Sequence, residues 1–108
     1  MPAFVLVVDD DPLILDLTAG MLEELGCRVL TTPSASAALR ILREQPEITT
    51  LLTDVQMPGT SGIELVAEAR RIRSDLRVVF ASGRERIDGW PFLRKPFNLE
   101  ELSRLVQS

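Results

Sequence analysis

Three acidic side chains, a hydroxyl group and a lysine stand directly after short apolar runs in this sequence. Asp9 and Asp10 follow the first run, Asp54 ends a later one, and Ser82 and Lys95 follow two others. In a parallel sheet the carboxyl ends of the strands meet at one edge, so we expect these polar groups to converge there. Clustered carboxylates raise each other's pKa, and hard oxygen ligands suit Mg²⁺. The pattern therefore predicts an acidic Mg²⁺ site with Lys95 as a second positive charge.

Such a site suits phosphoryl transfer. This reaction needs mainly positioning and neutralisation of negative charge, and a carboxylate can act as its nucleophile by forming an aspartyl phosphate. The sequence contains no histidine, which excludes a Ser-His-Asp triad, a histidine-ligated zinc and a phosphohistidine within this chain. The phosphoryl donor must therefore be another molecule.

Each of these side chains alone has an ordinary structural explanation. Acidic residues after the first run suit a helix N-terminus, where each charge stabilises by about 0.3–1 kcal/mol. We assign Asp11 to that role, as the N-cap of a helix that starts with Pro12. Taken by itself, Asp54 is explained as a turn residue, and Lys95 is explained as a solvated surface charge. Their joint placement at the ends of four strands is what indicates a functional site.

The elements that position this site are short apolar runs alternating with amphipathic segments. This alternation predicts a parallel sheet with helices on both faces. Right-handed crossovers then favour a flavodoxin-like, doubly wound five-stranded α/β sheet of order 2-1-3-4-5 in one domain, residues 1–108. The expected strands cover residues 4–8, 28–31, 50–53, 78–81 and 92–93.

Apolar spacing and capping residues predict the helices. Gly26 should end the first helix in a left-handed conformation, Ser34 should cap the second, and Asn98 with Glu101 forms a capping box for the last. We expect a buried face in the first helix and another in the third. The residues expected on these two faces are Leu13, Ile14, Leu17, Met21, Leu22 and Leu25, and Ile63, Val66, Ala69 and Ile72.

Residues 83–90 form an unusually short connection between the last two strands. Returning along a five-residue strand requires about 17 Å, whereas eight helical residues span only about 12 Å. Eight extended residues reach about 26–29 Å. A doubly wound sheet usually has its fourth helix between these two strands. We therefore expect helix 4 to be shortened or absent here, with at most one helical turn in this crossover.

Composition excludes several classes of function. The net charge of −4 argues against direct nucleic-acid binding. No run approaches the ~20 apolar residues that span a bilayer, and the first residues lack the positive charge of a secretory signal, so we expect a cytoplasmic location and no membrane partner. Cys27 is the single cysteine, which excludes an internal disulfide, and we expect it to be buried.

The sequence resembles the receiver domain of two-component response regulators. The segments that carry the resemblance are residues 7–10 (VVDD), 52–59 (LTDVQMPG) with Gly62, 81–83 (ASG) and 95–97 (KPF). The resemblance implies that Asp54 accepts a phosphoryl group from a sensor histidine kinase or a histidine phosphotransfer domain. It also implies Mg²⁺ bound by Asp10, Asp54 and the backbone carbonyl of Gln56, with Asp9 acting through water.

Further roles follow from the same resemblance. Ser82 and Lys95 would bind phosphoryl oxygens, Phe92 occupies the aromatic switch position, and Gln56 and Arg84 match positions that tune autodephosphorylation. The resemblance implies a cis bond between Lys95 and Pro96, and chemistry limited to autophosphorylation and autodephosphorylation rather than enzymatic turnover. The family's output surface also allows a weak homodimer, although here that surface is rebuilt by the short crossover.

Three alternatives remain open at this point. A haloacid-dehalogenase-like phosphohydrolase would use Asp9 and Asp11 as its nucleophile motif, but it leaves Asp54 unexplained. A protein-interaction module without phosphorylation would not need the complete set of acidic residues, Ser82 and Lys95. A flavin carrier is disfavoured because no phosphate-binding loop follows the first strand.

Overall fold

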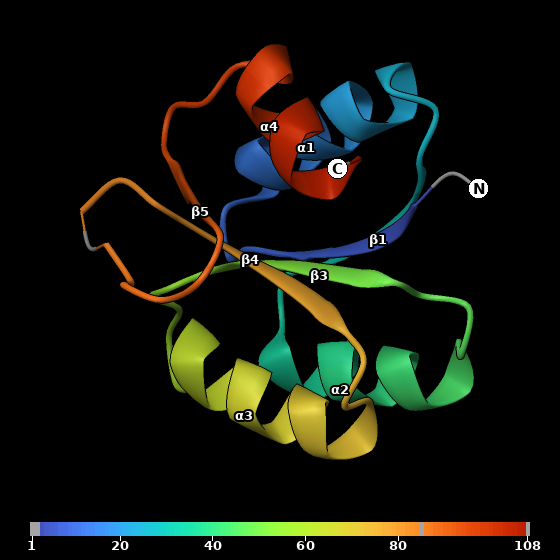
Figure 1. Ribbon diagram of the computed structural model, residues 1–108. Coiled ribbons are helices and arrows are strands. Elements are labelled where there is room, and N and C mark those ends of the chain that lie inside the picture. Colours follow the sequence, from blue (N-terminus) through green and yellow to red (C-terminus); the bar gives the residue numbers. More distant parts are fainter. Residues whose placement is uncertain (1–2, 85, 108) are drawn as a thin grey trace.

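The strands form one parallel sheet of order β2-β1-β3-β4-β5, which confirms the predicted flavodoxin-like topology. The computed structural model describes residues 3–84 and 86–107 (Figure 1). Val8 pairs with Thr53, and Asp54 pairs with Ala81, so β1, β3 and β4 each end within one residue of the neighbouring strand. The strands are β1 (Phe4–Val8), β2 (Arg28–Thr32), β3 (Thr50–Asp54), β4 (Arg77–Ser82) and β5 (Phe92–Arg94).

Helices cover both faces of this sheet and create two separate cores. In Figure 1, α1 and α4 lie above the sheet, and α2 and α3 lie below it. Successive residues of a strand point to opposite faces, so Val5 and Val7 join the core under α1 and α4, while Leu6 and Val8 join the other. The helices are α1 (Pro12–Glu24), α2 (Ala35–Glu44), α3 (Gly62–Ile72) and α4 (Leu99–Val106).

The predicted helix ends are confirmed by their hydrogen bonds. Asp11 caps α1 by accepting from the N–H of Leu13 at 2.9 Å. At the other end Gly26 has φ +86°, and the N–H of Cys27 donates to the carbonyl of Leu22 at 3.0 Å, as in a Schellman motif. Ser34 and the Asn98–Glu101 capping box cap α2 and α4 in the same way. Cys27 is buried, as expected, and this burial raises the pKa of its thiol.

The predicted faces of α1 and α3 were partly wrong. Leu13 and Leu17 are 63% and 56% exposed, whereas Leu15 and the polar Thr18 are buried against the sheet. Apolar residues occur around most of α1, so periodicity alone does not identify the packed face. In α3, Ile63 is likewise exposed. Leu65, two residues later, is fully buried, although it was not among the residues expected on the buried face. Among the described residues, no helix has the length and apolar character needed to cross a membrane.

The crossover between β4 and β5 is extended, as its length predicted. None of its described residues, 83–84 and 86–91, is helical, and Figure 1 shows it as an open loop beside β4. Trp90 packs edge-on against Phe80, with ring centroids 5.8 Å apart, and Ile87 packs against the same core. These side chains cover the part of β4 that a fourth crossover helix would cover. The Lys95–Pro96 peptide bond is cis, as the family resemblance implied.

Candidate functional site

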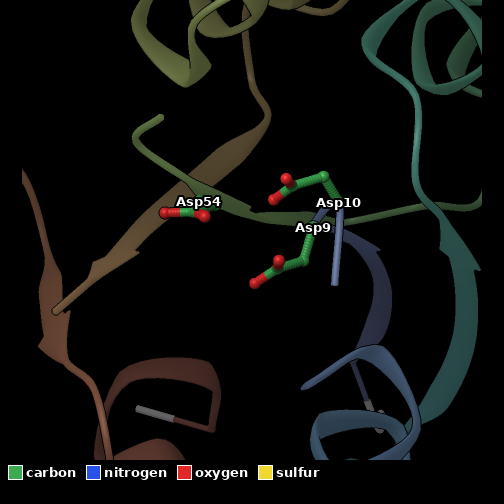
Figure 2. A group of neighbouring side chains, drawn as sticks. All are labelled: Asp9, Asp10 and Asp54. Carbon is green, nitrogen blue, oxygen red and sulfur yellow. The ribbon is translucent and has the colours of Figure 1, made fainter. Parts of the chain in front are cut away.

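The acidic side chains converge at the carboxyl edge of the sheet. Asp9 and Asp10 follow β1, and Asp54 is the last residue of β3. Carboxylate oxygens of all three lie within 4.8 Å of one another, and Figure 2 shows the three side chains around a common space. Oxygen ligands at this spacing suit a hard cation such as Mg²⁺. The sequence prediction of an acidic cluster is therefore confirmed in its geometry.

Lys95 joins the acidic residues of two strands. Its Nζ atom lies 2.5 Å from Oδ2 of Asp9 and 3.4 Å from Oδ2 of Asp54. The backbone N–H of Lys95 donates to the carbonyl of Ser82 at 2.9 Å, which fixes the residue at the end of β5. Lys95 therefore neutralises part of the negative charge that the strands bring together.

Asp9 and Asp10 differ sharply, although they are neighbours in the sequence. Asp9 is only 3% exposed, and besides the bond to Lys95 its Oδ1 atom accepts from the N–H of Asp11 at 3.0 Å. Asp10 is exposed. Asp9 therefore organises the loop after β1, and Asp10 offers the more accessible carboxylate. Since Asp9 is enclosed and Asp11 is a helix cap, the structure gives no support to Asp9 and Asp11 as a phosphohydrolase motif.

The environment of Asp54 disfavours its charged form. Burial raises the pKa of the Asp54 carboxyl, and the negative charge of Asp9 raises it further. The positive charge of Lys95 and the backbone N–H of Gln56 act in the opposite direction without cancelling the effect. A bound cation would relieve this repulsion, because it lies close to the carboxylates and favours their charged forms.

The remaining predicted site residues surround this cluster. Ser82 ends β4, is 4% exposed, and its hydroxyl accepts from the N–H of Arg84 at 3.1 Å. The side chains of Gln56 and Arg84 are exposed. Phe92 is half-buried, and the guanidinium of Arg86 lies 5.8 Å from its ring centroid. The predicted residues therefore lie at or near the carboxyl ends of β1, β3, β4 and β5, except Phe92, which begins β5.

Gly62 has a structural role that the sequence did not reveal. A Cβ atom at this position would lie 2.0 Å from the carbonyl oxygen of Asp54. The N–H of Gly62 donates to the carbonyl of Val55 at 2.7 Å, so the first turn of α3 is held against the end of β3. Only a residue without a side chain permits this approach. A glycine at the start of an amphipathic helix, a position where it has low helix propensity, was the available signal.

The fold and the site together define a flavodoxin-like domain with a cluster of three carboxylates at the carboxyl edge of its sheet and a lysine beside them. The chain belongs to the response regulator receiver domain family, whose family model matches residues 5–107. It is 33% identical to the DNA-binding transcriptional regulator NtrC of Azospirillum brasilense, over 97% of this chain and 24% of that protein. The chain thus spans about a quarter of this relative's length.

Solved structures show the same relationship. A receiver domain protein from Clostridium thermocellum superposes with a TM-score of 0.90 at 32% identity, covering 97% of this chain and 91% of that one. The receiver domain of the hybrid histidine kinase CckA gives a TM-score of 0.87 at 33% identity, covering 97% and 96%. Both likenesses extend over nearly the whole chain.

Replacing Gly62 tests the close approach between α3 and Asp54. We expect Gly62→Ala to lower the free energy of unfolding by more than about 2 kcal/mol, because its Cβ would meet backbone atoms that cannot easily move. Urea unfolding measures this. Gly20→Ala is the control: nothing lies within 4 Å of an added Cβ there, so better helix propensity should stabilise by up to about 1 kcal/mol. Equal stability of wild type and Gly62→Ala would contradict the packing.

Neutralising Asp54 tests the repulsion in the metal-free protein. A raised pKa in the folded state means that stability falls as the pH rises through that pKa. Asp54→Asn should therefore be more stable than wild type at neutral pH without Mg²⁺, and this gain should vanish below the ordinary value of 3.8. Urea unfolding across this pH range measures it, with the exposed Asp16→Asn as control. A destabilised Asp54→Asn protein at neutral pH would show that Lys95 outweighs the repulsion.

Proposed function

We propose that this chain accepts a phosphoryl group on Asp54 in two-component signal transduction, with residues 1–108 forming one receiver domain. The observation that supports this most is the position of Asp54, whose carboxylate lies within 4.8 Å of the carboxylates after β1 and 3.4 Å from the ammonium group of Lys95. In the transfer, a carboxylate oxygen of Asp54 forms a bond to phosphorus as the bond to the donor's histidine nitrogen breaks. Family membership supports the same assignment.

Receiver domains bind Mg²⁺ at an acidic pocket, and the donor set of this chain fits that ion. We assign the direct ligands to Asp10, Asp54 and the backbone carbonyl of Gln56, with Asp9 acting through water. The exposure of Asp10 and the enclosure of Asp9 by Lys95 and a backbone N–H support this division. The ion supplies the charge neutralisation that a transferred phosphoryl group requires.

The side chains around Asp54 have distinct proposed roles. Lys95, already 3.4 Å from Asp54, binds one phosphoryl oxygen, and the hydroxyl of Ser82 binds another. Phe92 responds to the position of Ser82 as the aromatic switch residue. Gln56 and Arg84, both exposed beside the site, set the access of water and hence the rate of autodephosphorylation. Receiver domains are generally not classical enzymes, and we propose no other turnover here.

A groove beside the site suits the phosphoryl donor. Receiver domains interact with histidine kinases and phosphotransfer partners, and we propose that the donor's helix docks on α1. The exposed Leu17 lines an apolar groove of about 330 Å³ that continues to Lys95. A helix bound there would place its phosphohistidine close to Asp54. The other lining residues are Ile14, Thr18, Met21, Pro96 and Phe97.

Other properties of the whole protein are inferred from the family. We propose a cytoplasmic location, where histidine kinases present their phosphohistidine, and no direct nucleic-acid contact by these residues. NtrC is a DNA-binding transcriptional regulator, but the matched part is only a quarter of it. A weak homodimer through the β5 edge is also part of the proposal, since that edge carries the family's usual dimerisation surface.

Phosphorylation is tested with acetyl phosphate, which needs no protein donor. We expect the wild-type chain to gain one phosphoryl group by intact mass when Mg²⁺ is present and none when it is chelated. Asp54→Asn should gain none, and Asp10→Asn should react far more slowly because a metal ligand is lost. Asp11→Asn, which alters only the helix cap, is the control. Modification of Asp54→Asn would place the acceptor elsewhere, and repeated turnover of a phosphate ester would favour a phosphohydrolase.

Donor docking is tested by placing a charge in the groove. Leu17→Glu should slow transfer from a phosphorylated histidine phosphotransfer domain by about tenfold or more, because an apolar contact of roughly 1.4 kcal/mol or more is lost. The donor is the one from a purified panel that reacts fastest with wild type. Transfer from acetyl phosphate should stay unchanged. Ile63→Glu, an exposed position on α3, is the control, and an equal loss there would contradict docking on α1.

A further inference from the structure

The charges of this acidic chain are unevenly distributed. Residues 65–95 contain eight of the twelve lysines and arginines but only four acidic residues, whereas the rest of the chain has twelve acidic and four basic residues. The positive segment covers α3 after its first turn, β4, the crossover and β5. Among the described residues, Arg84 and Arg94 form no ion pair. This segment therefore carries a net positive charge in a chain that is negative overall.

A trough lies within this positive region, at the end of the sheet opposite the acidic cluster. It has a volume of about 590 Å³ and is lined by residues from the end of α3, the start of β4 and the end of the crossover. Arg77 begins β4 and Ser82 ends it, so roughly 17 Å of strand separates the trough from the phosphoryl site. The lining residues are Arg70, Asp75, Leu76, Arg77, Val78, Gly89, Trp90 and Pro91.

Arg70 and Trp90 form the organised part of this trough. The Arg70 guanidinium lies 5.4 Å from the Trp90 ring centroid and donates to the carbonyl of Ser74 at 2.7 Å. Trp90 rests on Phe80 and remains 36% exposed. Both side chains are thus held in place before any partner binds, which lowers the entropy cost of binding. Arginine and tryptophan are also the residues most enriched in interface hot spots.

We propose that this trough binds an acidic segment of a partner protein, with an apolar side chain of that segment packed against Trp90. Arg70 and Arg77 supply the positive charge of the trough, and the guanidinium of Arg77 is held in place by donating to the carbonyl of Leu105 at 2.9 Å. Asp75 at the rim is already paired with Arg73 at 3.3 Å. A long polyanion such as nucleic acid is disfavoured, because the excess of acidic residues on the rest of the chain repels whatever extends past the trough. A short acidic segment fits within the positive region.

Trp90 is the single tryptophan of the sequence, so its fluorescence reports directly on the trough. The probe is a synthetic twelve-residue peptide of aspartate and glutamate with one central leucine, titrated into the full chain. We expect a saturable change in Trp90 emission, weaker binding at higher salt, and no change with a peptide in which lysine replaces every acidic residue. Binding of the basic peptide, or no emission change with the acidic one, would overturn the proposal.

Variants locate the binding on the trough. Arg70→Glu should weaken binding by about tenfold or more, the loss of one well-placed charge contact, while Arg40→Glu on the exposed face of α2 should change it little. Arg70→Gln, which removes the charge without reversing it, should fall between wild type and Arg70→Glu. Phosphorylation by acetyl phosphate should be the same in all four proteins, which also shows that they are folded. An equal loss in Arg40→Glu, or tighter binding of a single-stranded DNA oligomer than of the acidic peptide, would refute a protein-segment site.

Discussion

The repulsion among Asp9, Asp10 and Asp54 is the constraint on which the rest of this structure depends. Three carboxylates within 4.8 Å of one another are unfavourable in the absence of positive charge. The chain offsets this repulsion with the positive charge of Lys95 and with the hydrogen bond that Asp9 accepts from the N–H of Asp11. Two apolar cores also hold β1 and β3 in register. The polar edge is therefore held together by apolar burial elsewhere in the sheet.

Local signals explain why so much of the fold could be predicted. Strand positions follow from apolar runs, and helix ends follow from side chains such as Asp11 and Asn98 that bond to nearby backbone atoms. The sheet order follows from handed crossovers, and the extended crossover follows from its length alone. The convergence of the acidic residues was predictable for the same reason, since it needs only the strand order and the position of each strand end.

What the sequence did not reveal depends on tertiary contacts. The packed face of α1 is set by the sheet it covers, so Thr18 is buried while Leu17 is not. Asp9 and Asp10 have identical side chains, and they differ only in burial and in the tertiary and loop contacts of Asp9 with Lys95 and with the N–H of Asp11. The requirement for Gly62 comes from the carbonyl of Asp54, eight residues earlier in the chain. The functional roles of the site residues stay predictions, because contacts alone do not establish chemistry.

Lys95 belongs to two structures at once, since it bonds to the carboxylates and also lines the apolar groove along α1. A change at Lys95 would thus alter the proposed phosphoryl site and the proposed donor surface together, so that on this proposal one cannot change at Lys95 without the other. Leu17 lines the groove but takes no part in the acidic cluster. On the proposed function, a change of partner preference is therefore expected at Leu17 and its exposed neighbours on α1 and not at Lys95.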